Sequence, residues 1–271
     1  MNALTFTLLT RPVHSVDMSP LIPDQLTGKA ISKIKAMKLH CGNRSIAVDR
    51  LFKVSGIDRE NICFLKSREQ VNYIGRRMSR GNIKVKGTAG DFLGQKMTGG
   101  RIVVYGNAGN WTGSGMTGGE IEINGNSGNF LGAARPGDQY GMSNGTICIA
   151  GNAGDRVGDR MRRGIIVIRG DVGDYCGARL LAGTILVLGR VGQFTGYGMK
   201  RGTIVLAQRP KRLVATFTSC GQLKMEFLRL LFRQLARRGR QYKVFKEFGP
   251  EVHRFAGDLS WCGKGEILIL E

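Results

Sequence analysis

The sequence predicts a mainly β protein in the form of a parallel β-helix, a single-stranded solenoid of about 19 residues per turn, with an amphipathic helix near its C-terminus. Three observations predict this fold. A sequence unit recurs seven times, each unit contains one short alternating hydrophobic stretch, and 41 glycines accompany only six prolines. Glycine in such excess, without proline or low complexity, indicates many tight backbone corners rather than disorder.

The repeating unit is the strongest of these signals. Its consensus is M-x-x-G-x-I-x-V-x-G-x-x-G-[DN]-x-x-G, and successive anchor residues are separated by 19, 19, 26, 19, 19 and 19 positions. One unit alone cannot form a core, but stacked units bury a continuous one. The anchors are Met78, Met97, Met116, Met142, Met161, Leu180 and Met199.

The alternation within each unit predicts one β-strand per turn. Apolar side chains at period two indicate a strand with one buried face. Strands stacked about 4.8 Å apart place like residues above one another, so we expect columns of Ile, Val and Met to fill the interior. The buried pairs are Ile102/Val104, Ile121/Ile123, Ile147/Ile149, Ile166/Ile168 and Ile185/Val187.

An Asp or Asn follows a glycine corner in most units. We expect each side chain to accept a hydrogen bond from its own local backbone, which suits a tight corner. Calcium ligation is the alternative, but one such residue per turn, separated by glycines, favours the structural role. The residues are Asp91, Asn110, Asn129, Asp155 and Asp174.

Two irregularities in the array are candidate functional positions. The insertion AARPGDQYG, residues 133–141, adds seven residues, and such insertions in solenoids become loops on what is often the binding face. The second is an arginine that interrupts an aromatic column directly after the insertion. It either marks a functional position or simply reaches solvent because the insertion shifts the packing. The column is Phe92, Trp111, Phe130, Arg156, Tyr175 and Phe194.

The outward-facing strand column begins polar and ends apolar, so its later turns should be covered by the C-terminal region or by another subunit. Residues 222–238 read as an amphipathic helix with Arg229, Arg233 and Arg237 on its polar face, and Gly239 is a natural stop. We prefer a capping helix over the apolar column, with a partner-binding helix as the alternative. The column is Lys84, Val103, Glu122, Cys148, Val167, Leu186 and Val205, and the apolar helix face is Phe227, Leu228, Leu231, Phe232 and Leu235.

The chain divides into three predicted segments. Residues 1–72 form an N-terminal leader and cap, residues 73–207 the glycine-rich repeats, and residues 208–271 the C-terminal helix with closing strands YKVFK and GEILIL. In the leader, LTFTLL reads as a strand, and Ile62 and Phe64 read as a preliminary turn. The net charge of +21 is spread as +5, +9 and +7 over the three segments, so it forms no detachable basic tail. Such a field implies an acidic partner: nucleic acid, an anionic protein or membrane, or a polycarboxylate ligand.

No motif predicts catalysis or a metal site. His14, His40 and His253 are dispersed, and the GxSxG, Walker and HExxH patterns are absent. The six cysteines lack zinc or iron–sulfur spacing, and reduced thiols are typical of a cytoplasmic protein. We recognise no signal peptide, and no apolar run approaches the roughly 18 residues of a membrane span. We therefore expect a non-catalytic, cytoplasmic chain that carries no metal.

Two leader segments, PDQLTGKAISKI and CGNRSIAVDRLFKVSG, narrow the choice of family. Together with the repeat, they resemble the C-type subunit of formylmethanofuran dehydrogenase and of its bacterial counterpart, the formyltransferase/hydrolase complex. The repeat alone is also shared with the C-terminal β-helix of the glutamate synthase large subunit. The resemblance covers most of residues 20–207, and the tail matches weakly through RFAGDLSWCGKGEILIL. It implies a right-handed β-helix without a catalytic centre.

The resemblance also implies partners and a ligand. This scaffold subunit of one-carbon metabolism would pack against a hydrolase (deformylase-like) subunit, a formyltransferase subunit that uses tetrahydromethanopterin, and a further dehydrogenase-like subunit. The implied ligand is a formyl carrier of the methylofuran or methanofuran type, whose tail contains glutamates. A basic surface would hold such a polyanion loosely, because exposed ion pairs contribute only about 0–1 kcal/mol each.

The arginines that gather around turns four to six are the candidate contacts for this acidic tail. They could equally pair with acidic partner subunits, and the sequence does not decide between the two. They are Arg135, Arg156, Arg160, Arg162, Arg163 and Arg179.

Three alternatives remain open. The first is the equivalent subunit of a redox-active formylmethanofuran dehydrogenase, whose metals lie on other subunits; we favour the bacterial complex because a charge of +21 suits a long polyglutamate tail. The second is a glutamate-synthase-like structural β-helix that spaces two catalytic domains. The third is a nucleic-acid-binding basic solenoid, which is not favoured because no single-strand stacking motif such as RNP1 is present.

Overall fold

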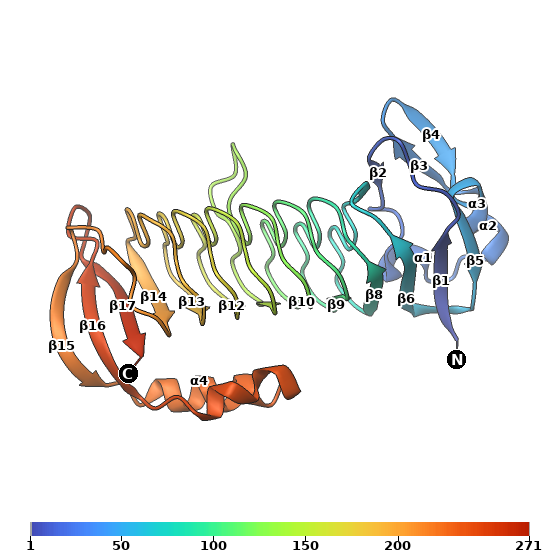
Figure 1. Cartoon of the computed structure of the whole chain (residues 1–271). Coiled ribbons are helices and arrows are strands. Elements are labelled where there is room, and N and C mark those ends of the chain that lie inside the picture. Colours follow the sequence, from blue (N-terminus) through green and yellow to red (C-terminus); the bar gives the residue numbers. More distant parts are fainter. Residues whose placement is uncertain (1, 271) are drawn as a thin grey trace.

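The protein is mainly β, with a large and mostly parallel sheet and a helix near the C-terminus (Figure 1). The structure is a computed structural model that describes residues 2–270, and the side chains of residues 240 and 241 lie outside that description. Thirteen strands form the large sheet in the order β15-β16-β17-β14-β13-β12-β11-β10-β9-β8-β6-β1-β5. The predicted mainly β class and the C-terminal helix are confirmed.

The repeats supply the middle of this sheet. Each unit contributes one strand, and all neighbours from β8 to β14 are parallel. Equivalent residues pair directly: Ile102 faces Ile121, which faces Ile147 across the 26-residue step. The strands are β8 (Asn82–Gly87), β9 (Arg101–Val104), β10 (Glu120–Ile123), β11 (Thr146–Ile149), β12 (Ile165–Ile168), β13 (Thr184–Val187) and β14 (Arg201–Leu206).

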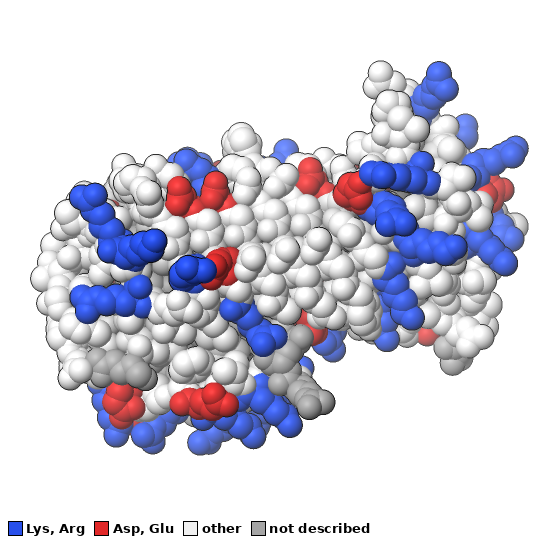
Figure 2. Space-filling model, viewed as in Figure 1, with Lys and Arg blue, Asp and Glu red and all other residues white. Residues whose placement is uncertain are grey.

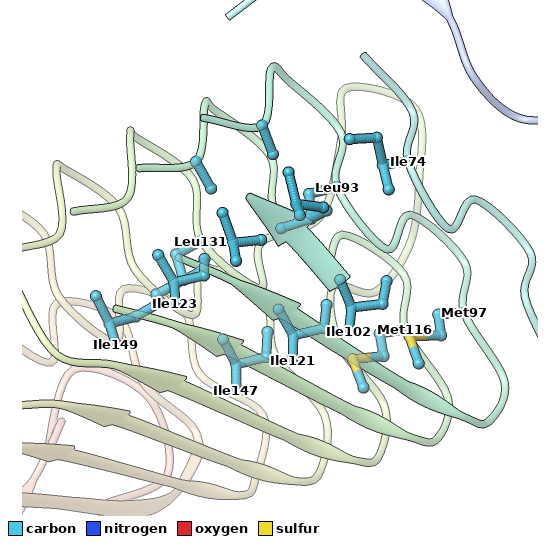
Figure 3. Packing of buried hydrophobic residues seen from close by; sticks show 14 of the residues in the cluster. Ile74, Leu93, Met97, Ile102, Met116, Ile121, Ile123, Leu131, Ile147 and Ile149 are labelled. Carbon is cyan, nitrogen blue, oxygen red and sulfur yellow. The ribbon is translucent and has the colours of Figure 1, made fainter. Parts of the chain in front are cut away.

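Stacked apolar columns form the core, as the repeat predicts. The side chains of Ile102, Ile121 and Ile147 follow one another along the array, and those of Met97 and Met116 form a second column (Figure 3). All of these side chains are fully buried. Burying one such side chain stabilises the fold by about 1.5–3 kcal/mol, so the repeated column accounts for much of the array's stability.

The corners between strands depend on left-handed backbone. Gly94 has φ of 63°, and a Cβ added there would lie 2.4 Å from Cδ1 of Ile121, which belongs to the unit of Met116. The residues of the aromatic column also adopt positive φ, which non-glycine residues rarely do. Stacking offsets that cost: Trp111 lies on Phe130 with ring centroids 4.1 Å apart, and Tyr175 lies on Phe194 at 4.9 Å.

The expectation that the Asp and Asn side chains bond their local backbone is wrong. Each reaches the next turn instead: Asp91 Oδ1 accepts the backbone N–H of Asn110 at 2.7 Å, and Asn110 Oδ1 accepts that of Asn129 at 2.8 Å. The 19-residue period places an identical corner directly above each side chain, so the neighbouring turn provides the nearest free donor. These residues therefore join turns to one another.

The later turns of the sheet are covered by the chain's own C-terminal region. Helix α4 (Phe227–Ala236) and the 3₁₀ helix η1 (Arg240–Lys246) pack Phe232, Leu235 and Phe245 over a cluster that includes Cys148 and Val167. In Figure 1, α4 lies below the row of strands and runs along the array. The prediction of a capping helix is thus confirmed, and its basic stripe of Arg229, Arg233 and Arg237 is exposed.

Two details of the C-terminal prediction are wrong. The helix begins at residue 227 rather than 222, because residues 218–224 form edge strand β15 against β16; Phe227 consequently lies in the first helical turn and is largely exposed. The segment YKVFK is part of η1 rather than a strand. In a 3₁₀ helix residues three apart share a side, which directs Tyr242 and Phe245 together into the cover.

Both ends of the large sheet are built from residues outside the repeats. At one end lie β1 (Ala3–Leu8), β5 (Phe52–Ser55) and β6 (Asp58–Ser67); at the other lie β15 (Thr218–Lys224), β16 (Glu251–Gly257) and β17 (Lys264–Leu270). The predicted strands at LTFTLL, around Ile62 and Phe64, and at GEILIL are confirmed.

A second, four-stranded sheet lies in the N-terminal part of the chain. Its strands are β2 (Val16–Asp17), β3 (Lys38–Cys41), β4 (Arg44–Ala47) and β7 (Val71–Asn72), and the helices beside it are α1 (Pro23–Leu26), α2 (Ile31–Ala36) and α3 (Val48–Leu51).

Candidate anion-binding groove

Four of the six predicted arginines line one groove of about 630 Å³: Arg160, Arg162, Arg163 and Arg179. Lys200 and Arg201, which the sequence interpretation did not select, complete its basic lining. The remaining lining residues are Gln139, Tyr140, Leu181, Ala182, Gly198 and Trp261. We call this site the basic groove.

The repeat explains why these cations meet. They occupy the positions just before and just after the anchor residue in three successive units, those of Met161, Leu180 and Met199. Strands stacked about 4.8 Å apart bring equivalent corner positions above one another, so residues 19 or 38 apart become neighbours. Arg160 and Arg179 hold φ of 56° and 53°, the left-handed conformation of the tight corner.

The groove has an excess of positive charge. No Asp or Glu lines it among the described residues. Arg160, Arg162, Arg163, Lys200 and Arg201 form no ion pair within the described part of the chain. Close like charges with no counter-charge are unfavourable, and an anionic ligand would relieve their repulsion. The arrangement can therefore bind a polyanion.

One arginine of the groove is already paired. Arg179 Nε donates to Asp159 Oδ1 at 2.8 Å, and Arg156 lies 3.4 Å from Oδ2 of the same carboxylate. Asp159 is buried, so this shared ion pair holds both arginines against the array. Arg179 thus lines the groove as a positioned cation with part of its charge compensated.

Two aromatic rings flank the groove and orient cations. The guanidinium of Arg162 lies 4.9 Å from the ring centroid of Tyr140, and Nζ of Lys200 lies 4.8 Å from that of Trp261. Tyr140 belongs to the insertion, which projects from the array as a loop in Figure 1. The insertion predicted as a binding element therefore contributes Gln139 and Tyr140 to the lining.

The other two predicted arginines lie elsewhere. The guanidinium of Arg135 lies 5.8 Å from the ring centroid of Phe92, and that of Arg156 lies 4.7 Å from that of Tyr175. Arg156 thus continues the aromatic column as a cation on a ring and does not line the groove. The insertion therefore leaves the register of this column unchanged.

Lys200 and Arg201 could have been found from the sequence, since they occupy the positions of Arg162 and Arg163 in the last unit. Trp261 carried no such signal, because it lies in the tail beyond the repeats.

Charge elsewhere on the molecule is unevenly placed. On the face seen in Figure 2, Lys and Arg gather over the N-terminal region and along α4, while the middle of the array is mostly uncharged. Elsewhere in the array, opposite charges form ion pairs, such as Arg101 with Glu122 at 2.8 Å. The basic groove differs because five of its six cations form no ion pair with any described residue.

Groups suited to chemistry are either buried or scattered. Burial raises the pKa of Cys148 to about 11 and that of Cys176 to about 12, so both thiols stay protonated at neutral pH. On the antiparallel strand pair β15–β16, Ser219 Oγ lies 2.7 Å from His253 Nε2, and this pair lines none of the main cavities. Within residues 2–270, no three His, Cys, Asp or Glu side chains converge as metal ligands would. None of the described helices has the length and apolar character to cross a membrane.

Comparison with known proteins places the chain in a family. The family model described as the GXGXG motif matches residues 137–228. No curated protein sequence matches. A chain in the X-ray crystal structure of the formyltransferase/hydrolase complex (FhcABCD) from Methylorubrum extorquens in complex with methylofuran shares 32% identity, with a TM-score of 0.90 and 98% coverage of each chain. Identity at this level across the whole fold shows that this chain belongs to a family of subunits found in the formyltransferase/hydrolase complex and formylmethanofuran dehydrogenase.

Proposed function

We propose that this chain is the C-type subunit of a formyltransferase/hydrolase complex, a non-catalytic scaffold that bridges the hydrolase and formyltransferase subunits. The similarity to a chain of the FhcABCD complex over 98% of both lengths supports membership of such a complex. The scattered reactive groups and protonated buried thiols support a scaffold role. A further dehydrogenase-like subunit completes the complex, which acts in the cytoplasm in tetrahydromethanopterin-dependent one-carbon metabolism.

The scaffold is a right-handed parallel β-helix in this proposal. Direct pairing of equivalent residues across seven strands supports it, as does the strong preference of parallel crossovers for the right-handed form. Residues 1–72 cap one end, residues 73–207 form the helix proper, and residues 208–271 close the other end and cover the later strands.

The ligand of the basic groove in this proposal is the glutamate-containing tail of a methylofuran-type formyl carrier. The single observation that carries it is the set of five cations without counter-charges on one groove wall. Each exposed pair with a glutamate contributes about 0–1 kcal/mol, so several together retain the tail without fixing it. A carrier arm that moves a formyl group between two active sites needs this kind of hold. In this proposal the chain itself binds no metal.

The test is a charge reversal in the purified native complex. Arg160→Glu, Arg162→Glu and Arg163→Glu together should lower carrier retention at least about tenfold, because about 1.4 kcal/mol of lost binding is a factor of ten. The matched control reverses Lys33, Lys35 and Lys38, which are exposed in the N-terminal region. Native mass spectrometry verifies the composition of the complex and its bound carrier in both. Unchanged retention in the groove variant, with the complex intact, refutes the carrier assignment.

A glutamate-synthase-like structural module is the second candidate, because the GXGXG motif matches residues 137–228. The two candidates predict different partners. Native purification that recovers glutamine- and glutamate-dependent activity favours this module, whereas recovery of formyl-transferring subunits with a glutamylated cofactor favours the scaffold.

A further inference from the structure

Two backbone ladders of the array end without an acceptor. In five successive turns, one corner residue donates its N–H to the carbonyl of the next turn; Ala89 donates to Asn107, and the last step is Val172 to Arg190 at 2.8 Å. A second ladder runs from Tyr73 to Tyr175, which donates to Gln193 at 2.8 Å. The next donors in line are Val191 and Phe194. Neither N–H finds an acceptor among the described residues.

A third ladder at another corner ends differently. It runs through Arg160 and Arg179 to Gly198, whose N–H donates to Oδ2 of Asp258 at 2.8 Å. Asp258 is 1% exposed, and its other oxygen accepts from the N–H and hydroxyl of Ser260 at 2.9 and 2.6 Å. Where the array has no further turn, a side-chain carboxylate thus takes the position of the missing carbonyl.

The residues at the two open ends line two cavities that share lining residues. One, of about 580 Å³, is lined by Val191, and the other, of about 210 Å³, by Phe194; Gln193 and Arg212 line both. Their volume suits a small molecule. They exist because residues 208–212, which would continue the array, leave its path and form one wall instead. We call them together the end cavity.

The end cavity is basic overall. Four cations and two carboxylates line it. Asp171 accepts the N–H of Arg190 and forms an ion pair with its guanidinium, and Asp174 accepts the N–H of Gln193. Lys211 and Arg212 form no ion pair with any described residue, and both are exposed. The cations are Arg190, Arg209, Lys211 and Arg212.

We propose that the end cavity binds a small dicarboxylate whose oxygens accept the N–H groups of Val191 and Phe194. Two unpaired backbone donors beside cations form an anion site. Phosphate could accept from the same donors. A carboxylate is favoured because, in the third ladder, the carboxylate of Asp258 accepts the N–H that a carbonyl of a further turn would accept. Two open donors and two uncommitted cations accommodate two carboxylates. This site shares no lining residue with the basic groove, so it does not depend on the proposed function.

The test observes the two donors directly. Glutarate is titrated into the ¹⁵N-labelled full-length chain at constant ionic strength, and the amide resonances of Val191 and Phe194 are followed. Saturable downfield shifts of both are expected, as a new acceptor polarises each N–H. Lys211→Gln with Arg212→Gln should weaken glutarate binding at least about fivefold, because charge-assisted contacts are lost.

Two controls separate this site from other effects. Lys33→Gln with Lys35→Gln should leave glutarate binding unchanged, as should charge reversal of Arg160, Arg162 and Arg163 in the basic groove. Absence of saturable shifts at Val191 and Phe194 overturns the proposal, and so does equal binding by the Lys211/Arg212 variant. Inorganic phosphate that binds as tightly as glutarate at the same ionic strength overturns the dicarboxylate assignment.

Discussion

The covered strand face and the open basic groove lie on the same repeats but have opposite chemistry. Beneath α4, the outward residues Cys148, Val167, Leu186 and Val205 are buried in an apolar cluster. At the corner near the anchors, the same turns present arginines of which only Arg179 has a counter-charge, that of Asp159. The residue type in each column of a repeat array can therefore vary independently of the other columns, because side chains at different positions of the unit face different surroundings.

Removing the cover should have the largest effect. Phe232 is 2% exposed between the strands and η1, so Phe232→Ala is expected to lower the free energy of unfolding by about 3–5 kcal/mol. Leu230, on the same helix but 68% exposed, is the matched control, and Leu230→Ala should change it by less than about 0.5 kcal/mol. Urea unfolding measures both. Equal effects would mean that α4 does not cover the array in solution.

Asp258 tests how the array ends. Burial favours its neutral form, but hydrogen bonds from Ser260 and the N–H of Gly198 outweigh this and lower its pKa. A carboxyl with a lowered pKa contributes stability above its unfolded pKa, and that contribution is lost as pH falls through the folded pKa. Asp258→Asn should therefore cost about 1–3 kcal/mol at pH 7 and less at pH 3. A cost independent of pH, measured by urea unfolding, would contradict the ionised cap.

In the basic groove, Lys200 and Arg201 should contribute modestly to binding of the carrier. Lys200→Gln with Arg201→Gln is expected to weaken retention of the carrier by about threefold to tenfold without loss of stability, since exposed pairs contribute about 0–1 kcal/mol each. Carrier content of the native complex and its thermal midpoint measure the two properties. A fall in the midpoint with unchanged carrier content would reassign these cations to structure.

Cysteine labelling distinguishes exposed thiols from the thiol beneath the C-terminal cover without any substitution. Cys220 and Cys262 are exposed, whereas burial raises the pKa of Cys148 beneath the cover to about 11. At pH 8 a thiol reagent should modify the exposed pair rapidly and Cys148 only after unfolding, because the thiolate is the reactive form. Peptide mass spectrometry identifies the sites. Rapid labelling of Cys148 would show that the cover opens.

The repeat array, residues 73–207, is predictable from the sequence pattern that each unit repeats. The anchors, the alternating strands and the glycine corners recur at one period, so stacking any two units determines the register of all. The apolar end of the outward column, together with the amphipathic stretch after residue 222, likewise predicted a cover. The start of that cover was misplaced, because pairing of residues 218–224 with β16 overrides their helical pattern.

The basic groove was partly predictable. The grouping of Arg160, Arg162, Arg163 and Arg179 around turns four to six indicates them from the sequence, and all four line the groove. Arg135 and Arg156 were grouped with them because nearness in sequence was taken as nearness in space. Their rings, Phe92 and Tyr175, lie at a different corner of the unit, which only the position within the repeat distinguishes.

The strands of the array, their order and their apolar columns follow from the sequence alone, because each of these depends on residues a fixed distance apart. How the array ends is visible only in the folded chain: Asp258 closes one ladder from 60 residues away, Trp261 lines the groove, and residues 208–212 leave two donors open. Contacts between a repeat and a non-repeating tail have no period, and they form only when the whole chain is folded.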